Sequence, residues 1–384
     1  MSQLAQEIID AIVDLVPDER SLLACALTAP SFVYASQRRI FYSISIQNVA
    51  ACNRLAAILT KSPHLGQYTR MLSLNIHGMP LDWACLEPIV SATTQVEQLA
   101  IKGSHKKTPL HVNSSLLVLL LSQSLRCVAL AHLDLPAYVI AVVLTECEEV
   151  CLFDISIPFD SADQEFPASP SLPLWHLDLS DSTNAIIPFL IRPRQQGFSQ
   201  FLTHLSIGES RSESMKGLLD ICASTLESLE IEFTHPFILP KLPALSHLEL
   251  RIRADRPDLR ETIPMSIALV LFRPPQLRSL VVAIIECAAR RAFDWSMFTR
   301  IGWSEWVGRD NGLIGLHAEE RGDAQLISVH FSLRYLERKL EPERYANFVT
   351  TIKAQLPRVL EAGFLTFSQR VSFVLLILRF SSAD

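Results

Sequence analysis

The chain has 384 residues, of which 49% are hydrophobic, and it carries 34 basic and 40 acidic side chains for a formal net charge of −6. This length exceeds the size at which one compact core usually stops growing, so we expect several domains or an elongated array of repeats. The slightly acidic balance gives no general attraction for nucleic acid or for an anionic membrane surface. We therefore expect neither nucleic acid nor a membrane as a partner.

The eight cysteines are scattered through apolar segments and form no CxxC pair. We interpret them as reduced thiols in the core and not as a disulfide framework. The first residues lack the basic and then apolar order of a secretory leader. The longest apolar runs are also far shorter than the roughly 20 residues that cross a bilayer. These features predict an intracellular protein, located in the cytoplasm, the nucleus or both.

Residues 1–46 predict a small helical module. Apolar residues recur at helical spacing from Leu4 to Val16, and Pro17 ends this first helix. Residues 21–27 predict a second apolar helix, which is followed by an apolar and aromatic tail. A module of about 40 residues cannot bury this much apolar surface by itself, so we expect it to dock on a neighbour. Residues 47–68 then predict a connecting helix.

One phrase, LxxLxL, recurs nine times between residues 69 and 282, with apolar residues at its positions 1, 4 and 6. Successive copies are 19 to 32 residues apart, close to the spacing of leucine-rich repeats, which this part of the chain resembles. Positions 4 and 6 alternate on a short strand and point into the core, so positions 3, 5 and 7 point outward. Segments between the strands, such as residues 137–145 and 215–223, are typical of helices. We therefore predict an α/β fold with an irregular, horseshoe-like solenoid over residues 69–284; an ordinary parallel α/β sheet is the alternative.

The outward positions of this sheet predict a binding surface. Residues of the same phase on adjacent strands lie about 4.8 Å apart, so they form rows across the sheet. The rows are small and partly apolar in the N-terminal half, whereas they carry carboxylates and imidazoles after Trp175. Because acidic patches favour encounter with positive segments, we expect a basic or hydrogen-bonding protein partner there. The predicted substrate-binding residues are His176, Asp178, His204, Glu230, Glu232, His247, Glu249 and Arg251.

Histidines beside carboxylates also occur in metal sites and in acid–base pairs. An open sheet face produces solvated polar side chains by default, however, and metal ligands have to converge. Glycine-rich phosphate loops and the motifs HExxH and GxSxG do not occur in the sequence. We therefore expect no metal, no cofactor and no catalytic residue, and thus a protein that is not an enzyme.

Residues 285–384 predict a region that closes the open end of the array. Trp295, Trp303 and Trp306 recur at nearly helical intervals, and we expect these aromatic rings to pack there. Leu326, Val329 and Phe331 predict a last strand, and residues 342–356 predict a helix. An apolar segment, residues 364–380, follows.

The N-terminal module resembles an F-box. The resemblance rests on Leu4, Glu7-Ile8-Ile9, Ile12, Leu15, Pro17-Asp18, Leu22-Leu23, Ala24-Cys25-Ala26-Leu27 and Phe32. The chain departs from the family in having Ala5 where proline is common and Phe32 in place of tryptophan. With the degenerate repeats that follow, the order of the segments is similar to that of a large fungal group of F-box-like proteins.

This resemblance implies that the module binds the Skp-type adaptor of a cullin-RING, SCF-type ubiquitin ligase and that the repeats hold a protein substrate. The adaptor-binding residues that it implies are Leu4, Ile8, Ile9, Ile12, Leu15, Leu22, Leu23 and Leu27. The alternative is a module that only seals the apolar end of the solenoid, as terminal repeats must. The protein would then be a repeat-based interaction scaffold with no link to ubiquitin.

Overall fold

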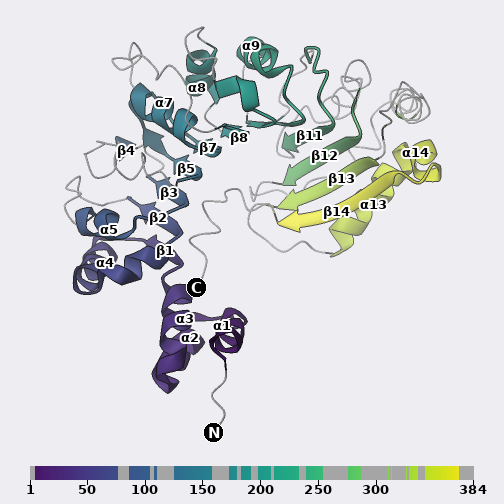
Figure 1. Ribbon diagram of the computed structural model, residues 1–384. Coiled ribbons are helices and arrows are strands. Elements are labelled where there is room, and N and C mark those ends of the chain that lie inside the picture. Colours follow the sequence, from purple (N-terminus) through teal and green to yellow (C-terminus); the bar gives the residue numbers. More distant parts are fainter. Residues whose placement is uncertain are drawn as a thin grey trace. The chain divides into compact units, whose positions relative to one another are not determined.

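The computed structural model describes residues 5–76, 86–103, 108–109, 125–157, 173–179, 183–191, 198–208, 212–232, 239–253, 276–286, 310, 313, 326, 328–335 and 342–371. These residues form a mixed α/β structure (Figure 1). The chain divides into two compact units: unit 1 is Met1–Leu172 with Leu375–Asp384, and unit 2 is Pro173–Val374.

Unit 1 begins with three helices, α1 (Gln6–Asp14), α2 (Glu19–Thr28) and α3 (Pro30–Ile40), which we call the N-terminal module. Asp18 caps α2, because its side chain accepts a hydrogen bond of 2.9 Å from the Ser21 N–H. The apolar tail predicted after Pro30 is itself a helix, since proline is well accommodated in the first turn. The three helices share a small core of Val13, Leu22 and Ala35, against which Val16, Phe32 and Ile40 pack.

The rest of unit 1 alternates strands and helices. Its further elements are β1 (Ser43–Ile46), α4 (Val49–Lys61), the 3-10 helix η1 (Pro63–Tyr68), β2 (Met71–Asn75), α5 (Glu87–Ala92), β3 (Gln98–Lys102), β4 (Thr108–Pro109), β5 (Cys127–Ala131), β6 (Leu133–Asp134), α7 (Ala137–Glu146) and β7 (Glu149–Phe153). Five strands pair in parallel in the order β1-β2-β3-β5-β7, and β4 pairs with β6 separately. The predicted connecting helix is therefore α4, and the Asn48 side chain caps it.

Unit 2 continues the same alternation. Its elements are β8 (His176–Leu179), α8 (Thr183–Leu190), β9 (His204–Ile207), α9 (Ser212–Cys222), β10 (Ser228–Glu232), β11 (His247–Arg253), β12 (Ser279–Glu286), β13 (Ser328–Tyr335), α13 (Pro342–Gln355), α14 (Pro357–Glu361) and β14 (Leu365–Val371). These strands are parallel and are ordered as in the chain, from β8 to β14. Within the described part of each unit, the first and last strands do not pair, so neither sheet closes into a barrel.

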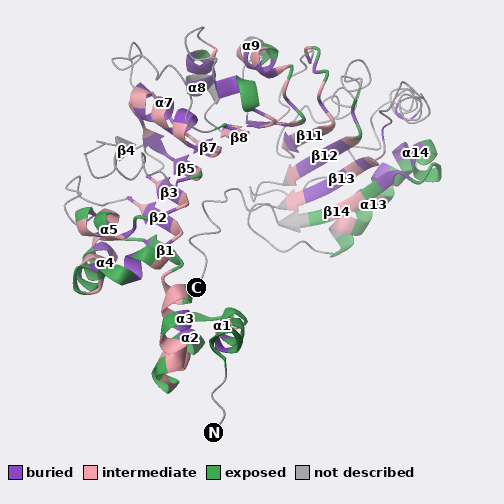
Figure 2. Ribbon diagram, viewed as in Figure 1, coloured by how far each residue is buried: buried purple, intermediate pink, exposed green. Residues whose placement is uncertain are grey.

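The register confirms the predicted alternation along the strands. In unit 2, position 4 of the phrase forms one row, Leu177↔Leu205↔Leu229↔Leu248↔Leu280. Each of these leucines is buried, with at most 1% of its surface exposed (Figure 2). The same phase is kept in unit 1, where Leu72, Leu99, Val128 and Val150 form the corresponding row. Burial of these apolar side chains is the main term that holds each sheet to its helices.

A backbone feature repeats at the start of the strands. The carbonyl at position 2 of one phrase accepts hydrogen bonds from two consecutive N–H groups at the start of the next strand. In unit 1, the Arg70 carbonyl accepts from Glu97 at 2.8 Å and from Gln98 at 2.9 Å. In unit 2, the Trp175 carbonyl accepts from Thr203 at 3.1 Å and from His204 at 2.9 Å. The recurring phrase thus corresponds to a recurring backbone geometry and not only to a recurring burial pattern.

The predicted last strand is β13, and the predicted helix over residues 342–356 is α13. The sheet does not end there, because β14 pairs with β13 in parallel from Val329↔Leu365 to Tyr335↔Val371. The region expected to close the array therefore contributes two strands to the sheet of unit 2. Trp295, Trp303 and Trp306 lie outside the described residues.

Among the described helices, none combines the length and the apolar character that crossing a membrane requires.

Candidate functional site

The N-terminal module divides the predicted adaptor-binding residues into buried and exposed sets. Ile9 and Leu22 are buried, and Leu22 belongs to the core of the module. Leu4 lies outside the described residues. The remaining five predicted residues are exposed to solvent, namely Ile8, Ile12, Leu15, Leu23 and Leu27. We call these five side chains the apolar patch.

Helical spacing explains the division. Ile8, Ile12 and Leu15 are separated by four and three residues, so they follow one stripe of α1, while Ile9 and Val13 follow the stripe that faces the core. In α2, Leu23 and Leu27 are likewise four residues apart. Leu15 and Leu27 keep 84% and 88% of their surfaces exposed. Exposed apolar side chains gathered on one small module are typical of a protein interaction site.

The contacts of the module with the rest of unit 1 are made by α3. Tyr34 of α3 packs edge to face on Tyr68 of η1, with ring centroids 5.6 Å apart. Most of the described residues of α1 and α2 are exposed, as the colours of Figure 2 show. The contact through α3 thus leaves the apolar patch accessible.

In unit 2, the outward side chains of β8 to β13 form what we call the polar face. The parallel register confirms the predicted rows. Position 3 gives His176↔His204↔Ser228↔His247↔Ser279, and position 5 gives Asp178↔Ser206↔Glu230↔Glu249↔Val281. All eight residues predicted to bind a substrate lie on β8 to β11, so the fold brings them onto one surface.

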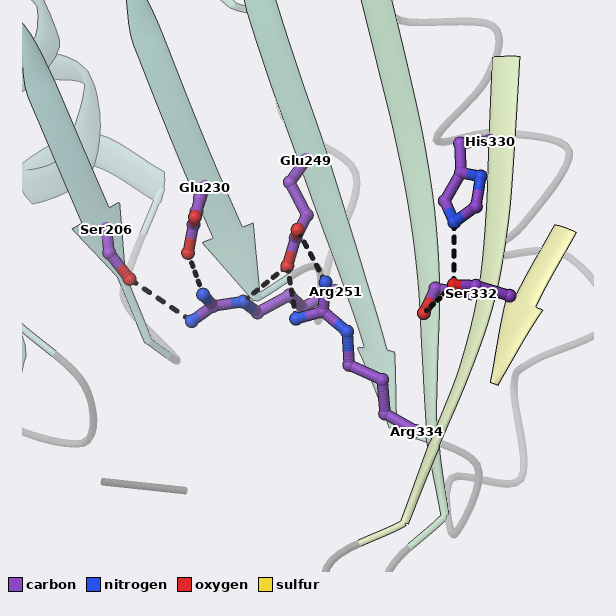
Figure 3. A network of polar contacts seen from close by, with 8 residues as sticks. Ser206, Glu230, Glu249, Arg251, His330, Ser332 and Arg334 are labelled. Carbon is purple, nitrogen blue, oxygen red and sulfur yellow. Dashed lines mark hydrogen bonds and ion pairs between the residues drawn. The ribbon is translucent and has the colours of Figure 1, made fainter. Parts of the chain in front are cut away.

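Two carboxylates of the polar face, those of Glu230 and Glu249, are paired with arginines (Figure 3). Glu249 is only 5% exposed and accepts a hydrogen bond of 2.8 Å from Arg251 Nε. Arg251 also forms an ion pair with Glu230 and donates a hydrogen bond of 3.1 Å to Ser206 Oγ. Arg334 holds Glu249 from the other side, with both of its terminal nitrogens 2.7 Å from the carboxylate oxygens. Arg253 lies 3.8 Å from Glu232.

This pairing changes the electrostatic character expected for the surface. Burial lowers the pKa of Arg251, while the charge of Asp178 raises it and that of Arg334 lowers it. Because burial disfavours an unpaired charge, the contacts with Glu230 and Glu249 are what keep the guanidinium at this position. The residues predicted as an acidic patch therefore form a largely compensated ionic network.

The imidazoles lie beside this network at the start of the strands. Trp175 packs edge to face on His204 with ring centroids 5.3 Å apart, and the rings of His176 and His204 are 6.2 Å apart. His204 Nδ1 lies 2.9 Å from Thr203 Oγ1. Burial lowers the pKa of His247, with a smaller lowering by His204, whereas Glu249 opposes the shift. The three histidines of position 3 are thus held in one row across β8, β9 and β11.

Sequence reasoning missed the part of the polar face on β13. His330 lies between two hydroxyl groups of β14, with Nδ1 2.8 Å from Thr366 Oγ1 and Nε2 2.7 Å from Ser368 Oγ. Arg334, which completes the ionic network, is on the same strand. The apolar pattern of Leu326, Val329 and Phe331 could have identified these residues, because the positions that alternate with it point outward. Its outward positions are 328, 330, 332 and 334.

The outward side of the unit 1 sheet is partly apolar. Ala100, Ala129 and Ala131 are buried there, and Cys151 and Phe153 pack against them. Burial raises the pKa of the nearby Cys127 thiol to about 12, so this thiol is protonated and unreactive at neutral pH. The expected contrast between a small apolar half and a polar half is therefore found between the described faces of the two units.

Within the described ranges, no group of three or more His, Cys, Asp and Glu side chains is arranged to hold a metal ion. The histidine row carries imidazoles that do not converge with carboxylates on a common point. No protein-family model matches the chain, and no curated protein matches it either.

Proposed function

We propose that the protein is the substrate receptor of a cullin-RING ubiquitin ligase of the SCF type. In this proposal, the N-terminal module binds a Skp-type adaptor through the apolar patch, and an irregular leucine-rich-repeat solenoid formed by the strands and helices holds a protein substrate. The protein contributes proximity between substrate and ligase and is not itself an enzyme.

The observation that carries the proposal is the apolar patch. Two short helices expose five large aliphatic side chains although the core of the module is small. Each such side chain gains roughly 1.5 to 3 kcal/mol when it is fully buried, so a partner that covers the patch has a large driving force. The link to ubiquitin comes from the resemblance of these helices to an F-box.

The exposed patch also separates this proposal from the capping alternative. A module that only sealed the end of a solenoid would direct its apolar residues against the neighbouring repeat. Here the neighbouring contact is made by α3, through Tyr34 and Tyr68, while Leu15 and Leu27 remain exposed. Capping alone leaves these leucines without a role, whereas binding of an adaptor accounts for them.

Co-purification of the full chain with a Skp-type adaptor tests the proposal. The variant that combines Leu15→Asp and Leu27→Asp places charges in the apolar patch without touching the core of the module, so it should fold and lose the adaptor. Phe201→Asp is the matched control, because Phe201 is an exposed apolar residue of unit 2. The control should retain the adaptor. If the unsubstituted chain captures no adaptor, the proposed function is wrong.

A further inference from the structure

The histidine row, His176, His204 and His247, is the feature of the polar face that the ionic network does not use. The three side chains stand at equivalent positions of β8, β9 and β11, and Ser228 of β10 completes the row. Each of the three is partly exposed. Histidine changes its charge near neutral pH, so a row of imidazoles makes the charge of a surface depend on pH.

The charge balance of the polar face depends on this row. Between β8 and β13, its described outward positions carry four carboxylates (Asp178, Glu230, Glu232, Glu249) and three guanidiniums (Arg251, Arg253, Arg334), which gives 3 − 4 = −1 with neutral histidines. Protonation of the three histidines of the row changes the balance to −1 + 3 = +2, and protonation of His330 on β13, which lies outside the row, would add one further charge. Because the arginines already hold most of the carboxylates, the added charge is not cancelled within the surface.

We propose that the polar face binds an acidic segment of a protein partner when the histidine row is protonated and releases it when the row is neutral. This inference rests on the proposed role of the polar face in holding a protein substrate, and it names the class of substrate as acidic. It reverses the expectation of a basic partner, because Arg251 and Arg334 neutralise the carboxylates on which that expectation depended.

The surroundings of the row decide the pH range. The charged groups around the row are Asp178 of β8, Glu230 and Glu232 of β10, and Glu249, Arg251 and Arg253 of β11, with Arg334 of β13 bound to Glu249; on β9, Ser206 is the next outward residue. Glu249 favours protonation of His247, while burial and the proximity of His204 oppose it. Protonation of His247 is therefore expected below the ordinary histidine pKa of about 6.5. A bound carboxylate would shift it upward.

Binding of a fluorescent oligoglutamate peptide of about ten residues to the full chain tests the inference, with anisotropy measured at about pH 5 and about pH 7.5 at low ionic strength. Glutamate side chains are largely ionised at both values. We expect binding at least roughly tenfold tighter at the lower pH, since three charges are added along one row of the surface. Equal affinity at the two pH values would overturn the inference.

The triple variant His176→Asn, His204→Asn and His247→Asn should lose most of the pH dependence, because of the histidines described on the polar face it keeps His330 alone. His64→Asn is the matched control, because His64 is an exposed histidine of unit 1, and it should behave like the unsubstituted chain. His204→Asn alone should lose part of the effect, which keeps the test decisive if the triple variant unfolds. An undiminished pH dependence in a folded triple variant contradicts the inference. Adaptor capture at neutral pH is measured separately, so failure here is distinguishable from failure of the proposed function.

Discussion

Arg334 on β13 donates two hydrogen bonds of 2.7 Å to the carboxylate of Glu249 on β11, although β12 lies between the two strands. The outward residues of β12 between them include Val281 and Ala283, which are small enough to let the guanidinium pass. Glu249 also accepts a hydrogen bond from Arg251. One buried carboxylate therefore links two strands, β11 and β13, that are far apart in the sequence.

Arg334→Ala is expected to lower the free energy of unfolding by about 1 to 3 kcal/mol, because Glu249 loses two charge-assisted hydrogen bonds while it stays buried. The loss should stay in this range because Arg251 still pairs with the carboxylate. Urea denaturation of the variant and of the unsubstituted chain measures the difference. Arg334→Lys should recover only part of it, since an ammonium group cannot form the two-pronged contact.

A double-mutant cycle tests whether the two residues act together. Arg334→Ala combined with Glu249→Ala should cost less than the sum of the single variants, because removing the carboxylate also removes the buried charge that lacks its partner. Additive single effects would show that the contact does not contribute to stability.

Two glycines are expected to respond in opposite ways to substitution by alanine. Gly217 lies inside α9, and a Cβ atom added there would meet Ile191 Cγ2 at 3.6 Å, an ordinary contact. Gly217→Ala should therefore raise the free energy of unfolding by about 0.5 to 1 kcal/mol, because alanine is better than glycine within a helix. A midpoint of urea denaturation that falls would contradict this prediction.

Gly66 in η1 is the counterpart. A Cβ atom added there would lie 2.5 Å from the Ala92 carbonyl oxygen, so the backbone of η1 or the end of α5 would have to move. Gly66→Ala should lower the free energy of unfolding by about 1 to 3 kcal/mol, as overpacked sites do. The same urea titration measures it, and hydrogen exchange of α5 should locate the effect there.

The sequence predicted the strands better than it predicted the chemistry of the surface. Positions 4 and 6 of the phrase are apolar and lie on the same face of the strand, so a shift of the register by one residue would expose them. Rows such as Leu205↔Leu229 could therefore be predicted from the sequence. The burial of Glu249 could not be derived in the same way, since it depends on Arg334, which is 85 residues further along the chain. Which long side chain crosses which strand is decided by the sizes of the residues between them.

The N-terminal module shows a similar limit. Helical spacing placed Ile8, Ile9, Ile12 and Leu15 on α1, but it did not separate the stripe that packs from the stripe that is exposed. That choice is made by the third helix, which contributes Ala35 to the core and which the sequence suggested only as an apolar tail. The exposed set, and therefore the candidate interface, became evident only from the packing.

Asp310 is expected to stabilise α14, although it precedes Arg358 of this helix by 48 residues in the sequence. Its buried carboxylate accepts hydrogen bonds from the Arg358 N–H at 3.1 Å and from the Val359 N–H at 3.0 Å, which are two donors in the first turn of the helix. Asp310→Ala should lower the free energy of unfolding by about 0.5 to 2 kcal/mol. Faster hydrogen exchange at residues 358 and 359 would accompany it, and unchanged exchange there would contradict the capping role.

His247 should make the stability of unit 2 depend on pH. Burial lowers its pKa in the folded chain below the ordinary value of about 6.5, so the unfolded chain binds the proton more readily. The free energy of unfolding is therefore expected to be highest above the unfolded pKa and to decrease as the pH falls from about 6.5 through the folded pKa.

Urea midpoints measured across this range, for the unsubstituted chain and for His247→Asn, test the assignment. The variant should lose part of the decrease, because asparagine does not titrate; an identical decrease in both proteins would assign the effect to other groups. A decrease that is larger in the variant would instead mean that Glu249 raises the pKa of His247 by more than burial lowers it. The histidine row would then be protonated more easily than the burial of His247 implies.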